Sequence, residues 1–490
     1  MRIRYASVPL VLLPFVLVAC GGVEGAAPDA DVVDAGDVTD AGDVADAAPD
    51  APPAPAIGDV LDCGTPASAG GLAAGTDLQR VDLNVTAFPM ARCNDGTAAM
   101  FFFRPATSVA GRSRWVIQLQ GGGSCKTGVG CAKRWCSVDT NFGMTQMTAS
   151  LAPMRGTVAD GILRQGGALG EPNPVGDWNH VFVRYCSSDE WSGTAGAVDV
   201  DTVHPVSGAP VRFRIQFNGA NIIDAVIATL RRDGASPPAY TLGGGSVELP
   251  DLDEATLLLF AGASAGSGGV THNADRLREQ LRATNSGLAF WALHDSGTNA
   301  PFESLDFSTT TMCRDFALCD YQAFVTSTRA TLWGQRGDAS CATWHAANDP
   351  AGAFRCDDND HVALHHVTTP MMVRMGLTDE LISGNAVEAM YTVPGRGLLT
   401  VPLWAELVRA RMLALPQANG TAEEPAAQPA PRFAPPCMKH ETLSSDEAVF
   451  GVHVTAGGAP RTMFGLLAAA LLGNTPTTAI WSPGDPVDCD

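Results

Sequence analysis

The stretch that decides the fold is Thr256-Leu257-Leu258-Leu259-Phe260-Ala261-Gly262-Ala263-Ser264-Ala265-Gly266. Its first six residues predict a buried strand, and the following stretch Val270–Arg282 is compatible with a helix. A serine between small residues where a strand turns into a helix is typical of a nucleophile elbow, because small neighbours let the chain turn sharply enough to expose the hydroxyl. A GxSxG pattern alone is weak in a chain with 52 glycines. The flanking strand and helix therefore carry the prediction that Ser264 is a catalytic serine.

Apolar runs alternate with amphipathic stretches from about residue 58 onward. The predicted strands are Met100–Arg104, Trp115–Gln120, His180–Cys186, Thr256–Ala261, Leu288–His294 and Met371–Leu377, and the predicted helices are Ala220–Arg231, Val270–Arg282, Leu403–Leu415 and Thr462–Leu472. This alternation predicts an α/β fold with a mainly parallel sheet and helices on both faces. In such a sheet the active site lies at the carboxyl ends of the strands, where Ser264 falls. The loop-rich, Cys-rich stretch 295–369 interrupts the pattern, and we expect it to be an insertion over the site.

The composition predicts a folded protein that does not bind nucleic acid. The 490 residues are 46% hydrophobic and 17% charged, which is enough for a sizeable core. The formal net charge of −21 argues against phosphate binding, which needs a basic face. Residues 21–60 contribute ten acidic side chains and no Lys or Arg. Residues 20–57 have almost no bulky apolar side chains, so we expect a disordered, acidic linker there.

The first twenty residues resemble an export signal with a lipidation site. Arg2 and Arg4 precede twelve uncharged residues from Val8 to Ala19, a run too short to span a bilayer as a helix. Leu17-Val18-Ala19-Cys20-Gly21 resembles the lipobox of bacterial lipoproteins, whose cysteine is acylated and becomes the mature N-terminus. We therefore expect a signal peptide at 1–19, a lipid on Cys20 that anchors the protein to the outer membrane or cell surface, and a catalytic domain at 58–490. The alternative is an ordinary signal peptide with a chance cysteine.

The thirteen cysteines fit an exported chain. With lipid on Cys20, twelve remain, an even number that allows up to six disulfides in an oxidising compartment. The alternative is a zinc site, indicated by Cys131 with Cys136 and by the segment His361-x-x-x-His365-His366. Neither cluster has the paired CxxC spacing of a structural zinc site, so we expect no metal and no other cofactor.

A glycine run follows an early predicted strand. Trp115–Gln120 leads into Gly121-Gly122-Gly123-Ser124-Cys125. In α/β-hydrolases, a loop at this place supplies half of the oxyanion hole. We expect the backbone N–H groups of Gly122, Gly123 and Ala265 to stabilise the developing oxyanion. The alternative is a plain glycine-rich loop.

A catalytic serine needs a base, and the base needs an orienting acid. In this fold the acid comes after the serine and the histidine comes last. Asp379 lies just past the predicted strand Met371–Leu377 and is the preferred acid. Asp295, which also ends a strand, and Glu380 are the rivals.

Of the ten histidines, His440 and His453 lie downstream of Asp379. His440 is in the loop-like segment Phe433–Glu441, which also contains Cys437, whereas His453 lies in a strand-like stretch. A loop histidine fixed by a nearby cysteine is the better candidate base. His272, close to Ser264 in sequence, is expected to point away along the following helix as a surface or packing residue.

These segments resemble the pectin acetylesterase/Notum family of extracellular serine carboxylesterases. The resemblance runs from about residue 90 to 470 and is carried by Asn173–Asn179, Tyr185–Gly193, Gly262–Gly266, Thr369–Glu380 and Phe433–Glu441. It implies an α/β-hydrolase fold with Ser264, Asp379 and His440 as the triad, which favours Asp379 over Asp295. One difference is that the family loop commonly carries an aromatic residue beside the oxyanion glycines, where this chain has Gly123-Ser124. The resemblance therefore does not define the acyl pocket.

The predicted function is an exported serine carboxylesterase that removes O-acyl groups from an extracellular glycan or another ester. We expect the acyl group to be short, acetyl to butyryl, because the runs Ser308–Thr311 and Asp357–Asp360 in the insertion offer no hydrophobic stripe for a fatty chain. The alternatives are a Notum-like deacylase of longer acyl esters on a protein or peptide, a transacylase, and a scaffold of the same fold without turnover. The sequence does not define the oligomeric state.

Overall fold

The computed structural model describes residues 61–63, 78–138, 143–150, 160–232, 239–242, 245–301, 304–306, 325–388, 390–415, 431–473, 478–485 and 487–489. The predicted signal peptide, the lipidation site at Cys20 and the acidic linker lie outside these residues. So does the run Ser308–Thr311 of the insertion.

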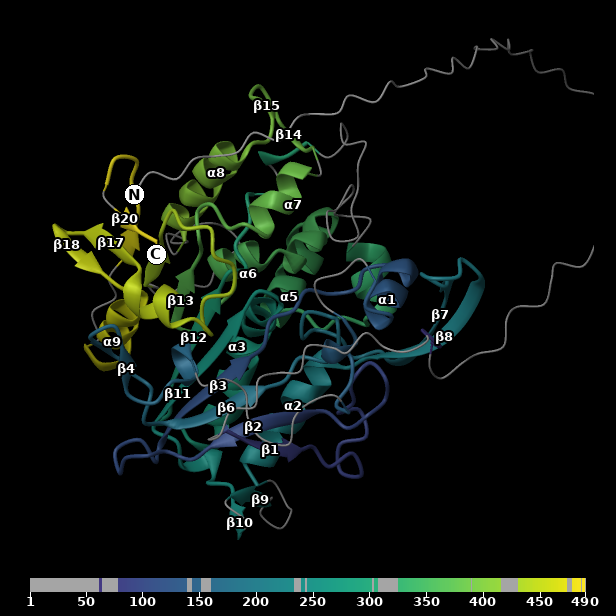
Figure 1. Ribbon diagram of the computed structural model, residues 1–490, viewed down its shortest axis with the longest axis horizontal. Coiled ribbons are helices and arrows are strands. Elements are labelled where there is room, and N and C mark those ends of the chain that lie inside the picture. The colour runs from purple at the N-terminus through teal and green to yellow at the C-terminus, as the bar shows by residue number, and fades with distance from the viewer. Residues whose placement is uncertain are drawn as a thin grey trace, which may run out of the picture. The chain divides into compact units, whose positions relative to one another are not determined.

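The main sheet contains nine described strands in the order β1-β2-β6-β3-β11-β12-β13-β16-β19 (Figure 1). The strands are β1 (Gln79–Asp82), β2 (Met100–Arg104), β3 (Arg114–Leu119), β6 (Asn179–Val183), β11 (Leu257–Ala263), β12 (Ala289–Asp295), β13 (Met371–Arg374), β16 (Arg432–Ala434) and β19 (Thr478–Ile480). The strands from β6 to β19 run parallel to one another, whereas β2 is antiparallel to both β1 and β6. The sheet is therefore mainly parallel, as predicted.

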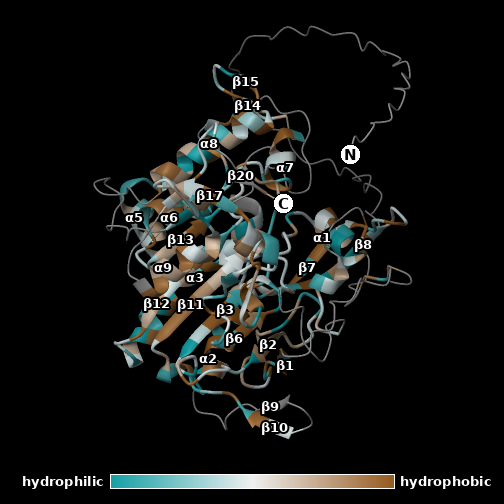
Figure 2. Cartoon of the chain, turned by 60° about the vertical axis from the view of Figure 1, so that its left-hand side comes forward, coloured by the Kyte–Doolittle hydropathy of each residue, from teal (hydrophilic) through white to brown (hydrophobic). Residues whose placement is uncertain are grey.

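The strand that leads to Ser264 lies near the centre of this sheet. β11 pairs with β3 on one side and β12 on the other, and all of its residues are buried. Figure 2 shows the hydrophobic colour along β11 and β12. A strand buried on both faces needs a continuous apolar run, which explains Leu257–Ala261. The sixth predicted strand is too long, because β13 ends at Arg374 and the chain then enters a loop.

Helices alternate with the strands along the chain and pack against the sheet. The structure describes α1 (Gly128–Trp135), α2 (Gly219–Leu230), α3 (Ala265–Thr284), α5 (Ala339–Asn348), α6 (Asn359–His365), α7 (Ile382–Glu388), α8 (Val401–Ala414) and α9 (Met463–Gly473). α3 contacts β3, β11 and β12, and α8 contacts β16 and β19. The four predicted helices correspond to α2, α3, α8 and α9. α3 begins five residues before the predicted start at Val270. The prediction missed its first turns because they contain glycines, which have low helix propensity.

The structure adds one feature that the sequence analysis did not predict and corrects another. The antiparallel hairpin of β7 (Gly196–Val203) and β8 (Pro210–Phe217) packs on α1 around a second, smaller cluster of buried residues that includes Trp135, Phe213 and Trp333. The described part of the 295–369 insertion is largely helical, with α5 and α6, rather than loop-rich. The helices are short and are stabilised by tertiary contacts, so their periodicity is weak in the sequence.

Shorter strands pair outside the main sheet. They are β4 (Gly167–Ala168) with β5 (Glu171–Pro172), β9 (Ala239–Leu242) with β10 (Gly245–Glu248), β14 (Thr392–Val393) with β15 (Gly397–Leu398), and β17 (His453–Ala456) with both β18 (Ala459–Arg461) and β20 (Val487–Asp488). Within the described ranges, no helix is long and apolar enough to span a membrane.

Five disulfides join ten of the cysteines in the described part of the chain. They are Cys63–Cys136, Cys93–Cys186, Cys125–Cys131, Cys341–Cys356 and Cys437–Cys489. Cys313 and Cys319 lie outside the described residues. Cys131 and Cys136 belong to different disulfides, so they do not form the zinc-binding thiolate pair considered from their spacing.

Candidate active site

Ser264 occupies the sharp turn between β11 and α3. Its backbone φ of 54° and ψ of −120° lie in a region that non-glycine residues rarely adopt. Its backbone N–H donates to the carbonyl oxygen of Asp295, at the end of β12, over 2.8 Å. A serine held in this conformation at the carboxyl end of a strand has the geometry of a nucleophile elbow.

The glycines on either side of Ser264 leave no room for a side chain. A Cβ atom at Gly262 would overlap the carbonyl oxygen of Gly266. A Cβ atom at Gly266 would overlap the carbonyl oxygen of Leu119, the last residue of β3. The turn brings the backbones of β11, α3 and β3 into direct contact, so both positions require glycine.

Asp379 and His440 form a hydrogen bond in which Nδ1 of His440 donates to Oδ2 of Asp379 over 2.8 Å. The Asp379 side chain is fully buried. Its other oxygen, Oδ1, accepts the backbone N–H groups of Leu381 and Ile382, at 3.0 and 2.9 Å, at the start of α7. One carboxylate oxygen thus caps a helix while the other holds the imidazole ring, which fixes the orientation of both side chains.

The loop that carries His440 is fastened to the loop that carries Asp379. The backbone N–H of Glu380 donates to the carbonyl oxygen of Met438 over 2.7 Å. The Cys437–Cys489 disulfide lies three residues before His440. The histidine is therefore held by a covalent link and by backbone contacts to the acid loop.

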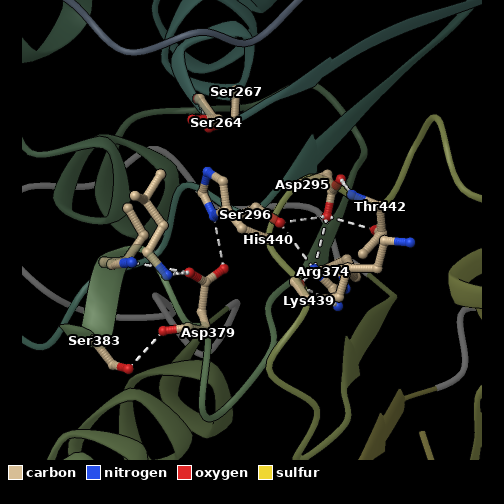
Figure 3. Close-up of polar contacts among 12 residues, drawn as sticks. Ser264, Ser267, Asp295, Ser296, Arg374, Asp379, Ser383, Lys439, His440 and Thr442 are labelled. Carbon is tan, nitrogen blue, oxygen red and sulfur yellow. Dashed lines mark hydrogen bonds and ion pairs between the residues drawn. The ribbon is translucent and has the colours of Figure 1, made fainter. Parts of the chain in front are cut away.

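The ring of His440 lies between Ser264 and Asp379 in Figure 3. One ring nitrogen faces Asp379, and the other faces the side on which Ser264 lies. That second nitrogen, Nε2, is buried and has no hydrogen-bond partner among the described residues. With the proton on Nδ1, Nε2 carries the lone pair and is the atom that can accept a proton.

The charges around His440 raise its pKa above the ordinary value of 6.5. Burial is the largest influence and by itself lowers the pKa of this imidazole. The hydrogen bond and charge of Asp379, with the charges of Glu441 and Asp295, outweigh burial. The site therefore stabilises the protonated imidazolium that a histidine forms when it acts as a base.

Asp295, the rival acid, bonds to a different set of groups. Its carboxylate accepts hydrogen bonds from the Arg374 guanidinium at 3.2 Å and from the backbone N–H groups of Thr442 and Leu443 at 2.8 and 3.1 Å. Figure 3 shows this cluster beside the Asp379–His440 pair. The structure thus brings Asp379, rather than Asp295, to His440.

The other rivals lie in different surroundings. Glu380 is exposed. His453 begins β17, where its Nδ1 lies 2.5 Å from the carbonyl oxygen of Gly451. His272 is buried in α3, and burial, its largest influence, lowers its pKa to about 4. It is therefore a packing residue rather than a surface residue.

The glycine loop after β3 is held by side chains that bind its carbonyl oxygens. The indole N–H of Trp191 donates to the carbonyl oxygen of Gln120 over 2.9 Å, and the Arg134 guanidinium donates to that of Gly122 over 2.7 Å. In a planar trans peptide, a carbonyl bond points opposite to the N–H of the next residue. The bond from Arg134 therefore also fixes the direction of the Gly123 N–H. Gly122 and Gly123 have φ angles of +141° and +61°.

The third candidate donor, Ala265, is the first residue of α3. The N–H groups in the first turn of a helix have no partner within the helix, and the helix dipole favours negative charge there. β3 and β11 are neighbours in the sheet, so the glycine loop and the start of α3 leave the same edge. This arrangement places all three candidate donors at the carboxyl ends of adjacent strands.

The segment Tyr185–Gly193 contributes a buried charge behind the glycine loop. Glu190 accepts a hydrogen bond from the Ser124 hydroxyl at 2.7 Å and pairs with Arg329 at 2.5 Å. Arg329 also pairs with Asp357 at 2.7 Å. Ser124, which follows Gly123, is therefore bound to a buried network of charges.

Glu441 is a residue of the site that the sequence analysis did not single out. Its carboxyl group lies against Gly121, where a Cβ atom would overlap Oε1. Oε1 is buried and has no hydrogen-bond partner among the described residues. Burial is the main cause that raises the pKa of Glu441, and the nearby charge of His440 opposes it. Its position next to His440 in the sequence was the one available signal.

Comparison with protein families places the chain among known sequences. The family model described as Pectinacetylesterase matches residues 73–342, which is more than half of the chain. The chain is 32% identical over 228 residues to the human palmitoleoyl-protein carboxylesterase NOTUM, covering 45% of this chain and 37% of that protein. It is 33% identical over 210 residues to the Drosophila melanogaster protein of that name, covering 42% of this chain and 25% of that protein. The chain thus spans less than half the length of these relatives.

Comparison with solved structures identifies the fold. The structure of the Wnt deacylase Notum from Drosophila matches with a TM-score of 0.54 and 23% sequence identity, covering 83% of this chain and 96% of that one. Together with the mainly parallel sheet and its helices, this similarity confirms the predicted α/β-hydrolase fold.

Proposed function

Since the chain belongs to the pectinacetylesterase family, we propose that it is a serine carboxylesterase that cleaves esters through an acyl-enzyme on Ser264. The observation that carries the proposal is the position of His440, whose Nδ1 lies 2.8 Å from Asp379 and whose ring lies between that carboxylate and Ser264 (Figure 3). A nucleophile, a base and an orienting acid in this order form the catalytic unit of serine hydrolases.

In the proposed cycle, Nε2 of His440 takes the proton of the Ser264 hydroxyl as its oxygen attacks the ester carbonyl. The N–H groups of Gly122, Gly123 and Ala265 donate hydrogen bonds to the oxyanion that forms. His440 then returns the proton to the leaving alcohol, which leaves an acyl group on Ser264. Water, deprotonated by His440, then attacks this acyl group. The bond from the acyl carbon to the Ser264 oxygen breaks, His440 returns the proton to that oxygen, and the acid is released.

We propose that the substrate is a short-chain ester, with O-acetyl groups on an extracellular glycan as the preferred class. The support comes from the position after the oxyanion glycines, where Ser124 is bound to the buried Glu190–Arg329–Asp357 network. A long acyl chain gains about 0.8 kcal/mol for each buried CH₂ only against apolar walls. The run Asp357–Asp360 gives no further support, because Asp357, Asp358 and Asp360 are buried in ion pairs rather than spread over a pocket.

A chain-length series tests this preference. We expect kcat/KM on nitrophenyl esters from two to sixteen carbons to be highest at two to four carbons, and acetylated polysaccharides to release acetate. The hydrolysis rate of the Ser264→Ala protein, measured in parallel, is subtracted as the uncatalysed background. A maximum at eight carbons or more would overturn the short-chain proposal while leaving the esterase mechanism intact.

The second candidate function is the deacylation of long acyl esters on a protein or peptide. It is favoured by the relatives, which are named palmitoleoyl-protein carboxylesterases. The same ester series decides between the two candidates. A transacylase would use the same residues, and a rise in acyl transfer to an added alcohol at the expense of free acid would identify it.

Labelling with a fluorophosphonate followed by peptide mapping tests the nucleophile independently of the substrate. We expect the label on Ser264, as an activated serine reacts with this reagent. A folded protein that takes up no label would support the scaffold alternative. A label on another serine would overturn the assignment of Ser264.

We also propose that the protein is exported and tethered through a lipid on Cys20. The support is the lipobox-like segment Leu17–Gly21 and the five disulfides of the described domain, which form in oxidising compartments. Cys20→Ser is expected to release the protein from membranes. Mature wild-type protein cleaved elsewhere than before Cys20 would contradict the tether.

A further inference from the structure

Three buried histidines converge beside α5 and α6, outside the Ser264–His440 site. His345 lies on α5, His361 lies on α6 and His366 follows α6 directly. Figures 1 and 2 both show α5 beside α6. The exposed fractions of the three residues are 0%, 8% and 2%. Imidazole rings are rarely buried together, because each carries two polar nitrogens that need partners.

Two of these ring nitrogens have the spacing of ligands on one metal ion, and the third lies close to them. Nε2 of His345 lies 3.2 Å from Nε2 of His361. One potential ligand atom from each histidine, together with Sγ of Cys341, lies within 4.8 Å of the others. Two nitrogens bound to a tetrahedral zinc ion at about 2.0–2.1 Å are about 3.3 Å apart. The distance between His345 and His361 matches this value.

A hydrogen bond on the outer nitrogen of His345 directs the lone pair of its other nitrogen toward a neighbouring ring. Nδ1 of His345 donates to the carbonyl oxygen of Asp349 over 3.1 Å, which leaves the lone pair on Nε2, facing His361. A backbone carbonyl that holds the second nitrogen of a histidine is the usual outer partner of a metal ligand. Nε2 of His366 is buried and has no hydrogen-bond partner among the described residues. A cation bound among the rings would accept the lone pair of Nε2 of His345 and give Nε2 of His366 a partner.

We propose that His345, His361 and His366 form a binding site for one divalent transition-metal ion of the zinc class. Imidazole nitrogens suit such ions, and a ligating histidine must be neutral. Cys341 is joined to Cys356 and supplies no thiolate, which leaves three nitrogen ligands.

The proposed site would change the expectation, drawn from ligand spacing, that the chain has no metal centre. The sequence displayed His361 and His366 together, but His345 lies sixteen residues earlier and on another helix. The Cys341–Cys356 disulfide brings the start of α5 back to the segment before α6. The tertiary structure therefore completes a group of ligands that the spacing rule does not recognise.

The expected role of the ion is to hold α5 against α6. α6 is in turn bound to the rest of the domain, since Asp358 at its start pairs with Arg411 of α8 at 2.6 Å. Asn359, the first residue of α6, also lies against Gly268 of α3, the helix that begins beside Ser264. Loss of the ion should lower the melting temperature and leave esterase activity at 25 °C close to that of the loaded protein.

The test uses the purified, oxidised protein, freed of metal with a chelator and titrated with Zn²⁺ by calorimetry and with Co²⁺ by absorption spectroscopy. We expect one ion per chain, a higher melting temperature with Zn²⁺, and the visible spectrum of tetrahedral Co²⁺. Absence of saturable binding, together with an unchanged melting temperature, would overturn the proposal. This measurement needs no variant and therefore does not depend on the folding of a mutant.

Variants then locate the ion. His345→Ala and His366→Gln are each expected to weaken Zn²⁺ binding by about 10-fold or more. His365→Ala is the matched control, because the ring of His365 lies beside that of His361 without belonging to the group. His204→Ala is a second control, since His204 lies in a separate group with Cys63 and Cys136. Binding that is lost with either control, or retained with both test variants, would contradict the site.

Discussion

Two buried aspartates, Asp295 and Asp379, stand at the ends of neighbouring strands and differ in what they bind. Asp295 ends β12, and Asp379 follows β13 by five residues. Both side chains are completely buried. Asp379 shares its carboxylate between His440 and the start of α7, whereas Asp295 binds Arg374 and the backbone that follows His440. A buried acid at or after the end of a strand therefore does not by itself identify the residue that binds His440.

The difference between the two acids lies in the group that each one neutralises. Arg374 carries a permanent charge, so Asp295 contributes the same interaction in every step of a reaction. In the proposed cycle His440 gains and loses a proton, so the interaction with Asp379 is strongest when the imidazolium exists. The backbone carbonyl oxygen of Asp295 also accepts a hydrogen bond from the backbone N–H of Ser264. We therefore propose that Asp295 has a structural role, in which it holds the turn at Ser264 and the loop after His440. Asp379 is proposed to orient His440.

The largest expected effect is that of removing the Ser264 hydroxyl. Ser264→Ala is expected to reduce kcat by about 10⁶-fold, because no other oxygen forms the acyl-enzyme. The free energy of unfolding should change by less than about 1 kcal/mol, since the deleted hydroxyl is small. Burst and steady-state kinetics on nitrophenyl acetate measure the first quantity, and urea unfolding measures the second. Retained turnover in a folded Ser264→Ala protein would contradict the proposed mechanism.

The second prediction concerns the orienting acid. Asp379→Asn is expected to reduce kcat by about 10⁴-fold, since the amide neither fixes the correct tautomer of His440 nor stabilises its positive charge. The matched variant is Asp295→Asn, measured on the same ester at the same pH. If Asp295→Asn lowers kcat more than Asp379→Asn does in folded proteins, the two roles are interchanged.

The third prediction concerns stability. Here Asp295→Asn is expected to have a larger effect than Asp379→Asn, the reverse of their expected effects on kcat. Asp295→Asn leaves Arg374, which is 2% exposed, without its carboxylate, and breaking a buried ion pair in this way costs about 3–5 kcal/mol. Asp379→Asn retains an oxygen that can cap α7 and is expected to cost less. Urea unfolding of both variants measures the difference. An equal loss of stability in the two proteins would remove the structural distinction between the acids.

The smallest expected effect is on the pH profile. The reaction needs neutral His440, so kcat/KM should fall as the pH drops through the raised pKa of this histidine, above its ordinary value of 6.5. Glu441→Gln removes a negative charge that raises this pKa, so the acidic limb should move to lower pH by less than about one unit.

The control for the pH profile is Glu447→Gln, because Glu447 is exposed and its partner is Lys439 rather than His440. It should leave the acidic limb unchanged. A shift of the limb to higher pH in Glu441→Gln would show that the charge of Glu441 does not act on His440.

The sequence by itself determined the parts of the protein that depend on local order along the chain. The apolar run before Gly262 and the small residues around Ser264 predicted a strand, a turn and a helix, because burial and backbone packing restrict the residue types at each position. The order of Ser264, Asp379 and His440 along the chain narrowed the candidate acids and bases in the same way. The signal-like first twenty residues and the acidic linker are predictions of the sequence alone.

Only the tertiary structure decided which side chains meet. It directed Asp379 rather than Asp295 to His440, placed Glu441 against Gly121, and turned the Gly122 carbonyl toward Arg134. It also brought His345 to His361 from another helix. These contacts join residues far apart in the chain, and their geometry depends on the packing of several elements at once. A hydrogen bond is lost when two atoms shift by an ångström, whereas the residue pattern that predicts a strand or a helix is unchanged by such a shift.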